Sequence, residues 1–414
     1  MTATQHIALI SVHGDPAIEI GKEEAGGQNV YVRQVGESLA KQGWQVTMLT
    51  RKTHPDQEPI VEHHDNCRTV RLTAGPETFV HRDKIFPYLP EFVTQIQHFQ
   101  QDVGIQYSLI HTNYWLSSWV GMELKQRQPT VQVHTHHSLG SVKYRSVSDI
   151  PPIASTRLAT EKRCIETIDR VIATSPQEME DMRKVTSKGN IEVIPCGTDI
   201  HRFGSIPKTT ARQILGISPE TKLVFYVGRF DPRKGIETLV RAIGHSQLRG
   251  KADLQLIVGG GSRSGHKDGD ERDRLIALVR DLGMEEFVHF PGRIADGQMA
   301  EYYAAADVCV LPSHYEPFGL VAIEAMACGT PIVASAVGGL QYTIAHEETG
   351  LLVPPKDDIA FAEAIDRILC NPEFREELGL AARQRVLEQF SWDSVAERLS
   401  RVYTQLLEEP VLQL

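Results

Sequence analysis

The stretch that decides the fold covers residues 311–339 and reads LPSHYEPFGLVAIEAMACGTPIVASAVGG. The apolar run over 307–311 predicts a buried strand. A polar loop follows, and a helix is then expected over about 319–328, ended by Gly329 and Pro331. The stretch therefore predicts a strand, a loop with polar side chains, and a helix.

Two carboxylates lie in this stretch, Glu316 in the loop and Glu324 in the helix. The free amide groups of Phe318, Gly319 and Leu320 would stand at the helix N-terminus, which favours an anion. Carboxylates repel phosphate, so their expected partners are the hydroxyls of a ribose or a sugar ring. On periodicity alone, both acids are equally well read as solvated surface residues.

The motif EPFGLVAIEAMACGTP, in which seven residues separate Glu316 from Glu324, resembles the signature of retaining, nucleotide-sugar-dependent glycosyltransferases with two Rossmann-like domains (GT-B). The resemblance implies that Glu324 binds the nucleotide ribose and Glu316 the hydroxyls of the transferred sugar. The amides of residues 318–320 would assist both, and Ile294 would border the base. It implies neither a cofactor nor a metal.

Length and charge narrow the function classes. With 414 residues, the chain is long enough for two domains of roughly 200 residues each. A net charge of -10 argues against nucleic acid and against an anionic membrane surface as partners. Six cysteines without a C-x-x-C pair, no basic leader and no apolar run of about 18 residues predict a cytoplasmic protein.

The hydrophobic pattern predicts two α/β units in tandem. A strand over 7–12, a helix over 30–41 and a strand over 45–50 open the first unit. Its further strands are expected at 67–72, 109–112, 131–134, 170–174 and 191–194, with helices at about 90–103, 117–126, 157–167 and 176–184. Strands at 223–227, 254–258, 288–290, 307–311 and 350–353 form the second, with helices at 236–243, 273–282, 299–305, 359–369, 374–388 and 394–407. This alternation predicts two doubly wound parallel sheets, with domains over 1–197 and 210–388 and a cleft between them. The resemblance implies that the last helix, about 390–414, packs back on the first domain.

The first strand-to-helix turn does not fit a nicotinamide cofactor. The sequence Gly26-Gly27-Gln28-Asn29 is not G-x-G-x-x-G directly after the strand, and the second strand ends in Thr50-Arg51 rather than an acid. The glycine pair predicts backbone that approaches a ligand closely.

A cationic turn, GRFDPRKG over 228–235, opens the second unit where open α/β sheets bind phosphate. Arg229 offers a planar fork of donors and Lys234 a mobile point charge, which together suit a diphosphate. The resemblance places both against the leaving nucleoside diphosphate, whose charge they would stabilise.

Two patterns invite a metal hypothesis. His134 and His136 share one face of a strand, but no carboxylate partner follows nearby, so packed histidines fit better than zinc. The Asp268-Gly269-Asp270 triplet lies in a polar stretch that predicts a flexible loop rather than a metal clamp. No metal site is expected.

The acceptor residues are named through the resemblance. His137-Ser138 and Lys143 match the acceptor side of the family, with His136 as the alternative to His137. The opening around Gly27 and Gln28, with Lys84, HSLG at 137–140 and Lys143, is similar to the sucrose-phosphate synthases within this family. It implies glucose transfer from a nucleotide sugar, UDP-glucose, to fructose 6-phosphate. Gly27, Gln28 and Ser138 would contact the acceptor, and Lys84, Lys143 and Arg157 its phosphate.

Three alternatives remain beside this hypothesis. They are a sucrose-synthase-like transfer to unphosphorylated fructose, an inactive regulator that binds a sugar nucleotide, and a metal- or pyridoxal-dependent enzyme. No residue stands out as a covalent nucleophile beside a base, so the resemblance implies attack from the face that the leaving group departs from, with His137 over the glucose. A sucrose-phosphate phosphatase would be a separate protein. The donor base and the oligomeric state stay open.

Overall fold

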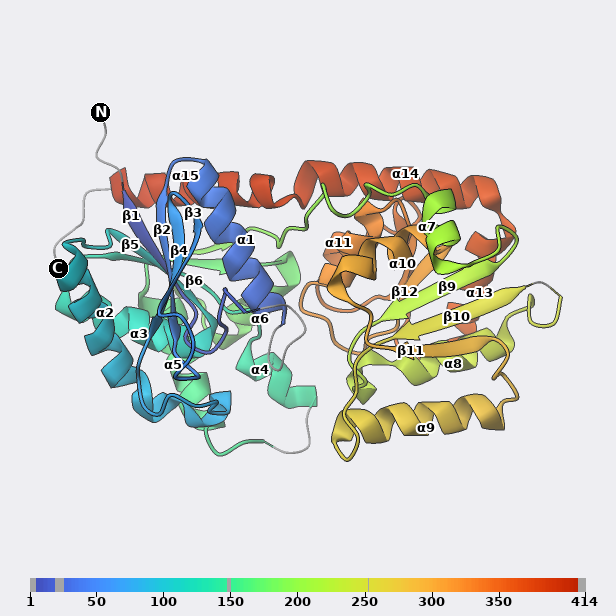
Figure 1. Ribbon diagram of the computed structural model, residues 1–414, viewed down its shortest axis with the longest axis horizontal. Coiled ribbons are helices and arrows are strands. Elements are labelled where there is room, and N and C mark those ends of the chain that lie inside the picture. The colour runs from blue at the N-terminus through green and yellow to red at the C-terminus, as the bar shows by residue number, and fades with distance from the viewer. Residues whose placement is uncertain (1–4, 19–25, 147–149, 252, 409–414) are drawn as a thin grey trace. The chain divides into compact units, whose positions relative to one another are not determined.

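The computed structural model describes residues 5–18, 26–146, 150–251 and 253–408 (Figure 1). The chain forms two compact units, one of Met1–Cys196 with Trp392–Leu414 and one of Gly197–Ser391. Below they are called unit 1 and unit 2. Each unit has its own parallel sheet with helices on both faces, which confirms the predicted fold class. The predicted final helix extends over 409–414, which lie outside the described residues.

The sheet of unit 1 has eight strands in the order β3-β4-β2-β1-β5-β6-β7-β8. Their bounds are β1 (His6–Ile10), β2 (Gln45–Arg51), β3 (Ile60–His64), β4 (Cys67–Leu72), β5 (Leu109–Asn113), β6 (Val131–Thr135), β7 (Arg170–Ala173) and β8 (Ile191–Val193). All neighbours pair in parallel except β3, which is antiparallel to β4 at the sheet edge. Strand β3 was not predicted, because none of its residues is buried and it carries no apolar run.

The helices of unit 1 cover both faces of this sheet. They are α1 (Gly27–Lys41), α2 (Leu89–Val103), α3 (Tyr114–Arg127), α4 (Gly140–Lys143), α5 (Ala154–Thr167), α6 (Pro176–Val185) and α15 (Trp392–Glu408), with short 3₁₀ turns η1 (Arg82–Lys84), η2 (Phe86–Tyr88) and η3 (Tyr144–Ser146). Helix α1 packs against α15, whereas α3 contacts α2 and α5. Val35 and Leu39, one turn apart on α1, are fully buried, as the 3.6-residue period requires.

The sheet of unit 2 has six parallel strands in the order β11-β10-β9-β12-β13-β14. Their bounds are β9 (Lys222–Val227), β10 (Leu254–Gly259), β11 (Val288–Gly292), β12 (Val308–Leu311), β13 (Ile332–Ser335) and β14 (Gly350–Val353). The strand order reverses between β9 and β12, and ligands of open α/β sheets bind at such a switch point. In unit 1 the reversal falls between β1 and β5.

Two helical layers cover the sheet of unit 2. Its helices are α7 (Lys208–Leu215), α8 (Ile236–His245), α9 (Lys267–Asp281), α10 (Met299–Ala305), α11 (Leu320–Ala327), α12 (Leu340–Thr343), α13 (Asp358–Cys370) and α14 (Pro372–Gln389), with the 3₁₀ turns η4 (Pro232–Lys234) and η5 (Asp296–Gln298). Helix α8 contacts α9 and α13, while α10 contacts α7 and α11 (Figure 1). The predicted strand, loop and helix over 307–328 are present as β12 and α11.

The predicted flexible loop over Asp268-Gly269-Asp270 is wrong. These residues form the first turn of α9, which begins at Lys267. Acidic side chains stabilise the N-terminus of a helix, where the helix dipole is positive, so the two aspartates stabilise the first turn of α9. A Cβ on Gly269 would lie 2.3 Å from the carbonyl oxygen of Arg263, so the close packing of the preceding turn requires glycine.

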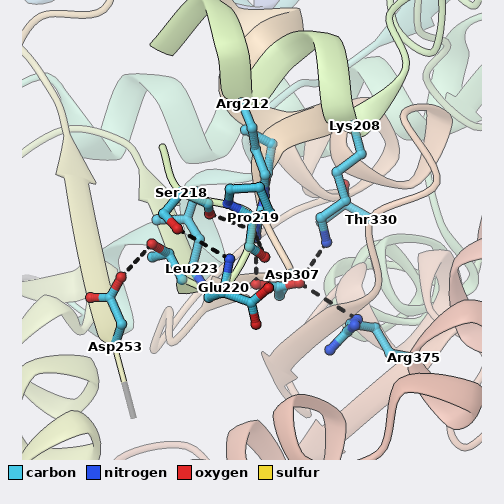
Figure 2. A network of polar contacts seen from close by, with 12 residues as sticks. Lys208, Arg212, Ser218, Pro219, Glu220, Leu223, Asp253, Asp307, Thr330 and Arg375 are labelled. Carbon is cyan, nitrogen blue, oxygen red and sulfur yellow. Dashed lines mark hydrogen bonds and ion pairs between the residues drawn. The ribbon is translucent and has the colours of Figure 1, made fainter. Parts of the chain in front are cut away.

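A buried carboxylate braces the edge of unit 2 opposite the switch point. Asp307, just before β12, accepts bonds from Lys208 Nζ (2.5 Å), Arg212 Nη2 (2.8 Å) and the amide of Leu223 (2.8 Å), and Arg375 Nε lies 3.6 Å away (Figure 2). This network joins α7, β9 and α14 to the start of β12. Buried charges are tolerated when they are paired and hydrogen-bonded in this way.

No helix in the described ranges is both long and apolar enough to cross a membrane. All six cysteines are free thiols, four of them buried: Cys67, Cys164, Cys196 and Cys309. The four buried thiols pack as small apolar side chains.

Candidate active site

In unit 2, two loops meet where β9 and β12 end. They are residues 228–235 and 312–319, and their backbones lie in direct contact. The amide of His314 donates to the carbonyl of Arg233 (2.7 Å). Gly235 has a φ of +67°, and a Cβ there would lie 2.0 Å from the carbonyl oxygen of Pro312. Only glycine permits both this backbone and this approach.

The loop contact brings two predicted donor residues together. Lys234 Nζ lies 2.5 Å from Glu316 Oε2, and their side chains are only 25% and 14% exposed. Arg229 is exposed, and within the described ranges no ion pair includes it. Arg233, by contrast, forms a two-point ion pair with Asp231 inside the same turn. The turn therefore presents Arg229 and Lys234, while Arg233 holds its shape.

Glu324 lies in a different polar environment from Glu316. Its Oε2 accepts a 2.7 Å hydrogen bond from the hydroxyl of Tyr303 on α10. Burial raises the pKa of Glu324 to about 7, although the Tyr303 hydrogen bond lowers it. Near neutral pH this carboxyl is therefore divided between its charged and neutral forms.

The start of α11 presents unpaired backbone donors, as predicted. Within the described part of the chain, no hydrogen bond engages the amides of Phe318, Gly319 or Leu320. Gly319 precedes the helix with a φ of +93°, a conformation that favours glycine. Free amides of this kind at the start of a helix can bind an anion or an oxygen of a sugar.

Buried polar atoms without partners gather around this edge of unit 2. Within the described residues they include the Tyr226 hydroxyl, Ser313 Oγ, His314 Nε2 and Ser335 Oγ. These residues lie at or just beyond the carboxyl ends of β9, β12 and β13. Because buried polar groups are nearly always hydrogen-bonded in proteins, such a cluster indicates a place where a polar ligand binds. Ile294, predicted to border the base, lies nearby, since a Cβ on Gly259 would lie 2.5 Å from its Cδ1.

In unit 1, predicted acceptor residues meet where β1, β5 and β6 end. Gln28 Nε2 donates to Ser11 Oγ (2.9 Å) and more weakly to the carbonyl of Asn113 (3.5 Å). His137 Nε2 lies 2.9 Å from Asn113 Oδ1. The ring of Tyr31 meets the ring of His137 edge-on, with centroids 4.7 Å apart. Asn113 thus links Gln28 to His137, and Gly27 is the first residue of α1 beside them.

Burial distinguishes His136 from His137. The His136 side chain is fully buried, and its Nδ1 lies 3.2 Å from His134 Nε2. His137 is only half-buried and has a left-handed backbone with a φ of +58°. Such a backbone costs a non-glycine residue about 1–3 kcal/mol and is concentrated at functional sites. Of the two histidines, His137 is therefore the one whose side chain a ligand can reach.

Arg157, predicted to bind the acceptor phosphate, is buried on α5. Its Nε donates to Glu161 Oε1 (2.7 Å), its Nη1 to the Tyr114 hydroxyl (3.1 Å) and its Nη2 to the carbonyl of Ser138. Glu161 also accepts from the amide of Gly140 (2.9 Å). Arg157 and Glu161 thus fix the segment that carries Ser138, and the phosphate role of Arg157 stays a prediction.

The two lysines predicted to bind this phosphate differ in their surroundings. Lys143 Nζ lies 6.0 Å from the centre of the Tyr144 ring, and Arg157 Cζ lies 5.6 Å from the same ring. Lys84 is exposed in η1. The carboxylate of its neighbour Asp83 interacts electrostatically with the hydroxyl of Tyr144. Tyr144 therefore links Lys143 and Arg157, whereas Lys84 lies in the separate turn η1.

One group of described residues has the composition of a metal site. His134, His136 and Cys164 are buried, with potential ligand atoms all within 4.8 Å of one another. His134 is already fully engaged, because its Nδ1 lies 2.9 Å from Thr112 Oγ1 and its Nε2 faces His136. The expectation of packed histidines fits His134, and the fold adds Cys164 from α5, which the sequence pattern did not associate with them.

Four residues of these sites were not predicted. Asn113 had one available signal, a polar residue directly after a predicted strand. Tyr303 and Glu161 lie on helices at positions that look like ordinary helix residues, and Cys164 looks like an apolar core position. Only the tertiary contacts show that Tyr303 bonds Glu324, whereas the i, i+4 spacing of Arg157 and Glu161 is a local signal for their ion pair.

Family models and relatives agree on one class of protein. A model described as glycosyl transferases group 1 matches residues 207–385, and one described as glycosyl transferase 4-like domain matches residues 26–197. D-inositol 3-phosphate glycosyltransferase of Kineococcus radiotolerans is 33% identical, with 99% of this chain and 97% of that protein covered. The protein of that name from Corynebacterium urealyticum is 35% identical, with 97% and 95% covered.

Solved structures add a second kind of relative. Sucrose-phosphate synthase from Thermosynechococcus elongatus is 50% identical, with a TM-score of 0.87 and coverage of 97% of this chain and 99% of that one. Anabaena HepE in complex with UDP and glucose is 20% identical, with a TM-score of 0.75 and coverage of 97% and 100%, and this likeness concerns the fold alone.

Proposed function

Because this chain belongs to the GT-B glycosyltransferases, which transfer a sugar from a nucleotide sugar, we propose that it transfers glucose from UDP-glucose to fructose 6-phosphate with retention of configuration. The products are sucrose 6-phosphate and UDP. The observation that carries this choice of substrates is the 50% identity to a sucrose-phosphate synthase over nearly the whole of both chains.

The donor is assigned to unit 2. Arg229 and Lys234 bind the diphosphate, Glu324 the ribose and Glu316 the hydroxyls of the glucose. The amides of residues 318–320 support this binding, and Ile294 borders the base. The free amides at α11 and the surrounding unpartnered polar atoms support the assignment, since a hydroxyl-rich anion satisfies both.

The acceptor is assigned to unit 1. Gly27, Gln28 and Ser138 contact the fructose, and Lys84, Lys143 and Arg157 bind its phosphate. A phosphate dianion needs two or three cationic donors, and these three residues supply them. Glu161 then holds Arg157 in place rather than competing for the ligand, because it is fixed by the Gly140 amide as well.

The proposed reaction is a single displacement on one face of the glucose. The bond between the anomeric carbon and the diphosphate oxygen breaks, and the acceptor hydroxyl forms a new bond from that face. The departing diphosphate takes the hydroxyl proton. Arg229 and Lys234 stabilise the charge that develops on the diphosphate, so catalysis depends on positioning and electrostatics. His137 contacts the glucose.

A second candidate differs only in the acceptor. The curated relatives at 33% to 35% identity are named for transfer to D-inositol 3-phosphate, which is also a phosphorylated polyol. Cations placed for one sugar phosphate also suit the other, so Lys84, Lys143 and Arg157 do not decide between them. The higher identity to the sucrose-phosphate synthase favours fructose 6-phosphate.

The deciding experiment measures UDP release from UDP-glucose in a metal-free buffer. Fructose 6-phosphate, fructose and D-inositol 3-phosphate are compared at equal concentration. Release only with fructose 6-phosphate, lost in Lys143→Ala and kept in Lys251→Ala, supports the proposal. Release with D-inositol 3-phosphate alone establishes the second candidate, and equal release with fructose establishes a sucrose-synthase-like enzyme.

A further inference from the structure

We infer that Asn113 is a positioning residue that holds His137 as the neutral tautomer with its proton on Nε2, so that Nδ1 presents a lone pair to a hydroxyl of the transferred sugar. The inference deepens the proposed function and rests on it for the role of His137. The state of the ring itself follows from geometry within unit 1.

The orientation of the Asn113 amide is fixed by its backbone neighbours. Nδ2 donates to the carbonyl of His111 (3.2 Å) and lies 3.5 Å from the carbonyl of Ile10. A flipped amide would place Oδ1 against these two carbonyl oxygens, which repel it. Oδ1 is therefore the atom 2.9 Å from His137 Nε2, and an oxygen acceptor there requires a proton on that nitrogen.

The remaining nitrogen of His137 is available to a ligand. Within the described part of the chain, no hydrogen bond reaches Nδ1, and the side chain is half-buried. Burial lowers the pKa of His137, so the ring is neutral at physiological pH. A neutral ring with its proton on Nε2 accepts at Nδ1 and cannot donate there, which matches a sugar hydroxyl rather than a phosphate.

The Asn113 side chain is not used for its usual local purpose. Asn113 stands at the N-cap of α3, where asparagine commonly accepts a bond from the helix backbone, yet its side chain caps nothing. The next residue, Tyr114, has a left-handed φ of +72°, as His137 has one of +58°. Four non-glycine residues of the described chain have such a backbone, and two of them lie at this hydrogen bond. His137 is one of its two partners, and Tyr114 directly follows the other.

The test reads the tautomer directly, by proton–nitrogen correlation NMR on protein labelled in its histidine rings. The His137 signal is assigned by its loss in His137→Gln. We expect a proton on Nε2 in the natural protein and a mixture of tautomers in Asn113→Ala. Asn66→Ala is the control, since Asn66 Oδ1 also accepts a side-chain bond, from Gln45, at a distant turn. A proton on Nδ1, a charged ring, or an unchanged ring in Asn113→Ala overturns the inference.

Kinetics give the second readout. Asn113→Ala should lower kcat of sugar transfer by about tenfold with little change in KM for fructose 6-phosphate, the effect of losing one positioning hydrogen bond. If the natural protein transfers sugar to no acceptor, the proposed function fails, while the ring spectrum still decides the tautomer.

Discussion

The Lys234 ammonium and the Glu316 carboxylate face each other across two loops of unit 2, with Nζ 2.5 Å from Oε2. One group is assigned to the diphosphate of the donor and the other to its sugar. Each neutralises the other at short range, so neither is left as an isolated charge in a half-buried site. The pair also ties the turn after β9 to the loop after β12, which fixes the spacing of the two halves of the donor site.

We predict that Lys234→Ala lowers kcat of glucose transfer by about 10²- to 10³-fold, the usual effect of removing one group that stabilises transition-state charge. Steady-state UDP release measures the loss. Because the pair is coupled, the double variant Lys234→Ala/Glu316→Ala should lose less than the product of the two single losses. Lys251→Ala, an exposed lysine of the same unit, should be unaffected. Activity within twofold of the natural protein in Lys234→Ala would remove Lys234 from the reaction.

Glu324 should make donor binding dependent on pH. Its pKa is raised to about 7, first of all by burial, so the charged form that accepts bonds from ribose hydroxyls is lost as the pH falls through 7. Between pH 8 and pH 6 the affinity for UDP should fall about tenfold from this group alone. Calorimetric titration of the natural protein and of Glu324→Gln isolates the effect, because the titration of UDP itself is common to both. A parallel pH dependence in the two proteins would exclude Glu324 as its source.

The same carboxyl affects stability in the opposite sense. A buried acid with a raised pKa destabilises the folded chain once the pH is high enough to charge it in the unfolded state, above about 4. Glu324→Gln is therefore expected to be at least as stable as the natural protein at pH 8. This separates a loss of UDP affinity from a loss of folding.

Asp307 should be required for the stability of unit 2. Asp307→Asn leaves Lys208 and Arg212 without their carboxylate, and breaking a buried ion pair costs about 3 kcal/mol of unfolding free energy. Urea titration measures the change. Asp253→Asn is the control, because Asp253 is exposed and its carboxylate accepts bonds from the neutral side chains of Thr221 and Gln255.

The pH dependence of that stability follows from the pKa of Asp307. Burial raises the pKa of Asp307, but Lys208 and the other donors lower it by a larger amount. The net pKa of Asp307 therefore lies below the usual range of an aspartate. A depressed acid contributes its full stability above the unfolded pKa of about 4 and loses it as the pH falls through the folded value. The difference in unfolding free energy between the natural protein and Asp307→Asn should therefore become smaller below pH 4. A constant difference would mean that packing, not charge, holds this edge.

Much of the fold could be predicted from the sequence because parallel strands are buried on both faces. Runs such as 223–227 and 308–311 are apolar throughout, and both lie in strands at the centre of their sheet. Strand β3 has no such run, since it lies exposed at the edge. The start of α9 was missed because two aspartates and a glycine favour a loop locally, whereas the helix dipole and close packing decide otherwise.

The candidate sites were predictable only where one loop carries the signal. Glu316 and Lys234 were each predicted from their own motif, but their contact required the fold. Asn113 and Tyr303 act through His137 and Glu324, which are distant in sequence, so no local pattern marks them. Glu161 lies four residues after Arg157 on the same helix, and only its burial distinguishes the pair from an ordinary surface ion pair. Their polar atoms matter because of what they face, and that depends on tertiary packing.

Arg157 and Glu161 allow the phosphate assignment to be tested apart from folding. Both side chains are 2% exposed, so Arg157→Leu alone leaves an uncompensated buried carboxylate and should lower the unfolding free energy by about 3 kcal/mol. The double variant Arg157→Leu/Glu161→Leu replaces the pair with apolar groups and should recover most of that loss. If Arg157 binds the acceptor phosphate, the double variant folds stably but loses preference for the phosphorylated acceptor. Its preference for fructose 6-phosphate over fructose should be about tenfold smaller than that of the natural protein. The ratio of kcat/KM for the two acceptors is the measurement, since a displaced Ser138 segment affects both acceptors alike. A double variant that folds and keeps the full preference would assign Arg157 to holding that segment, and leave the phosphate to Lys84 and Lys143.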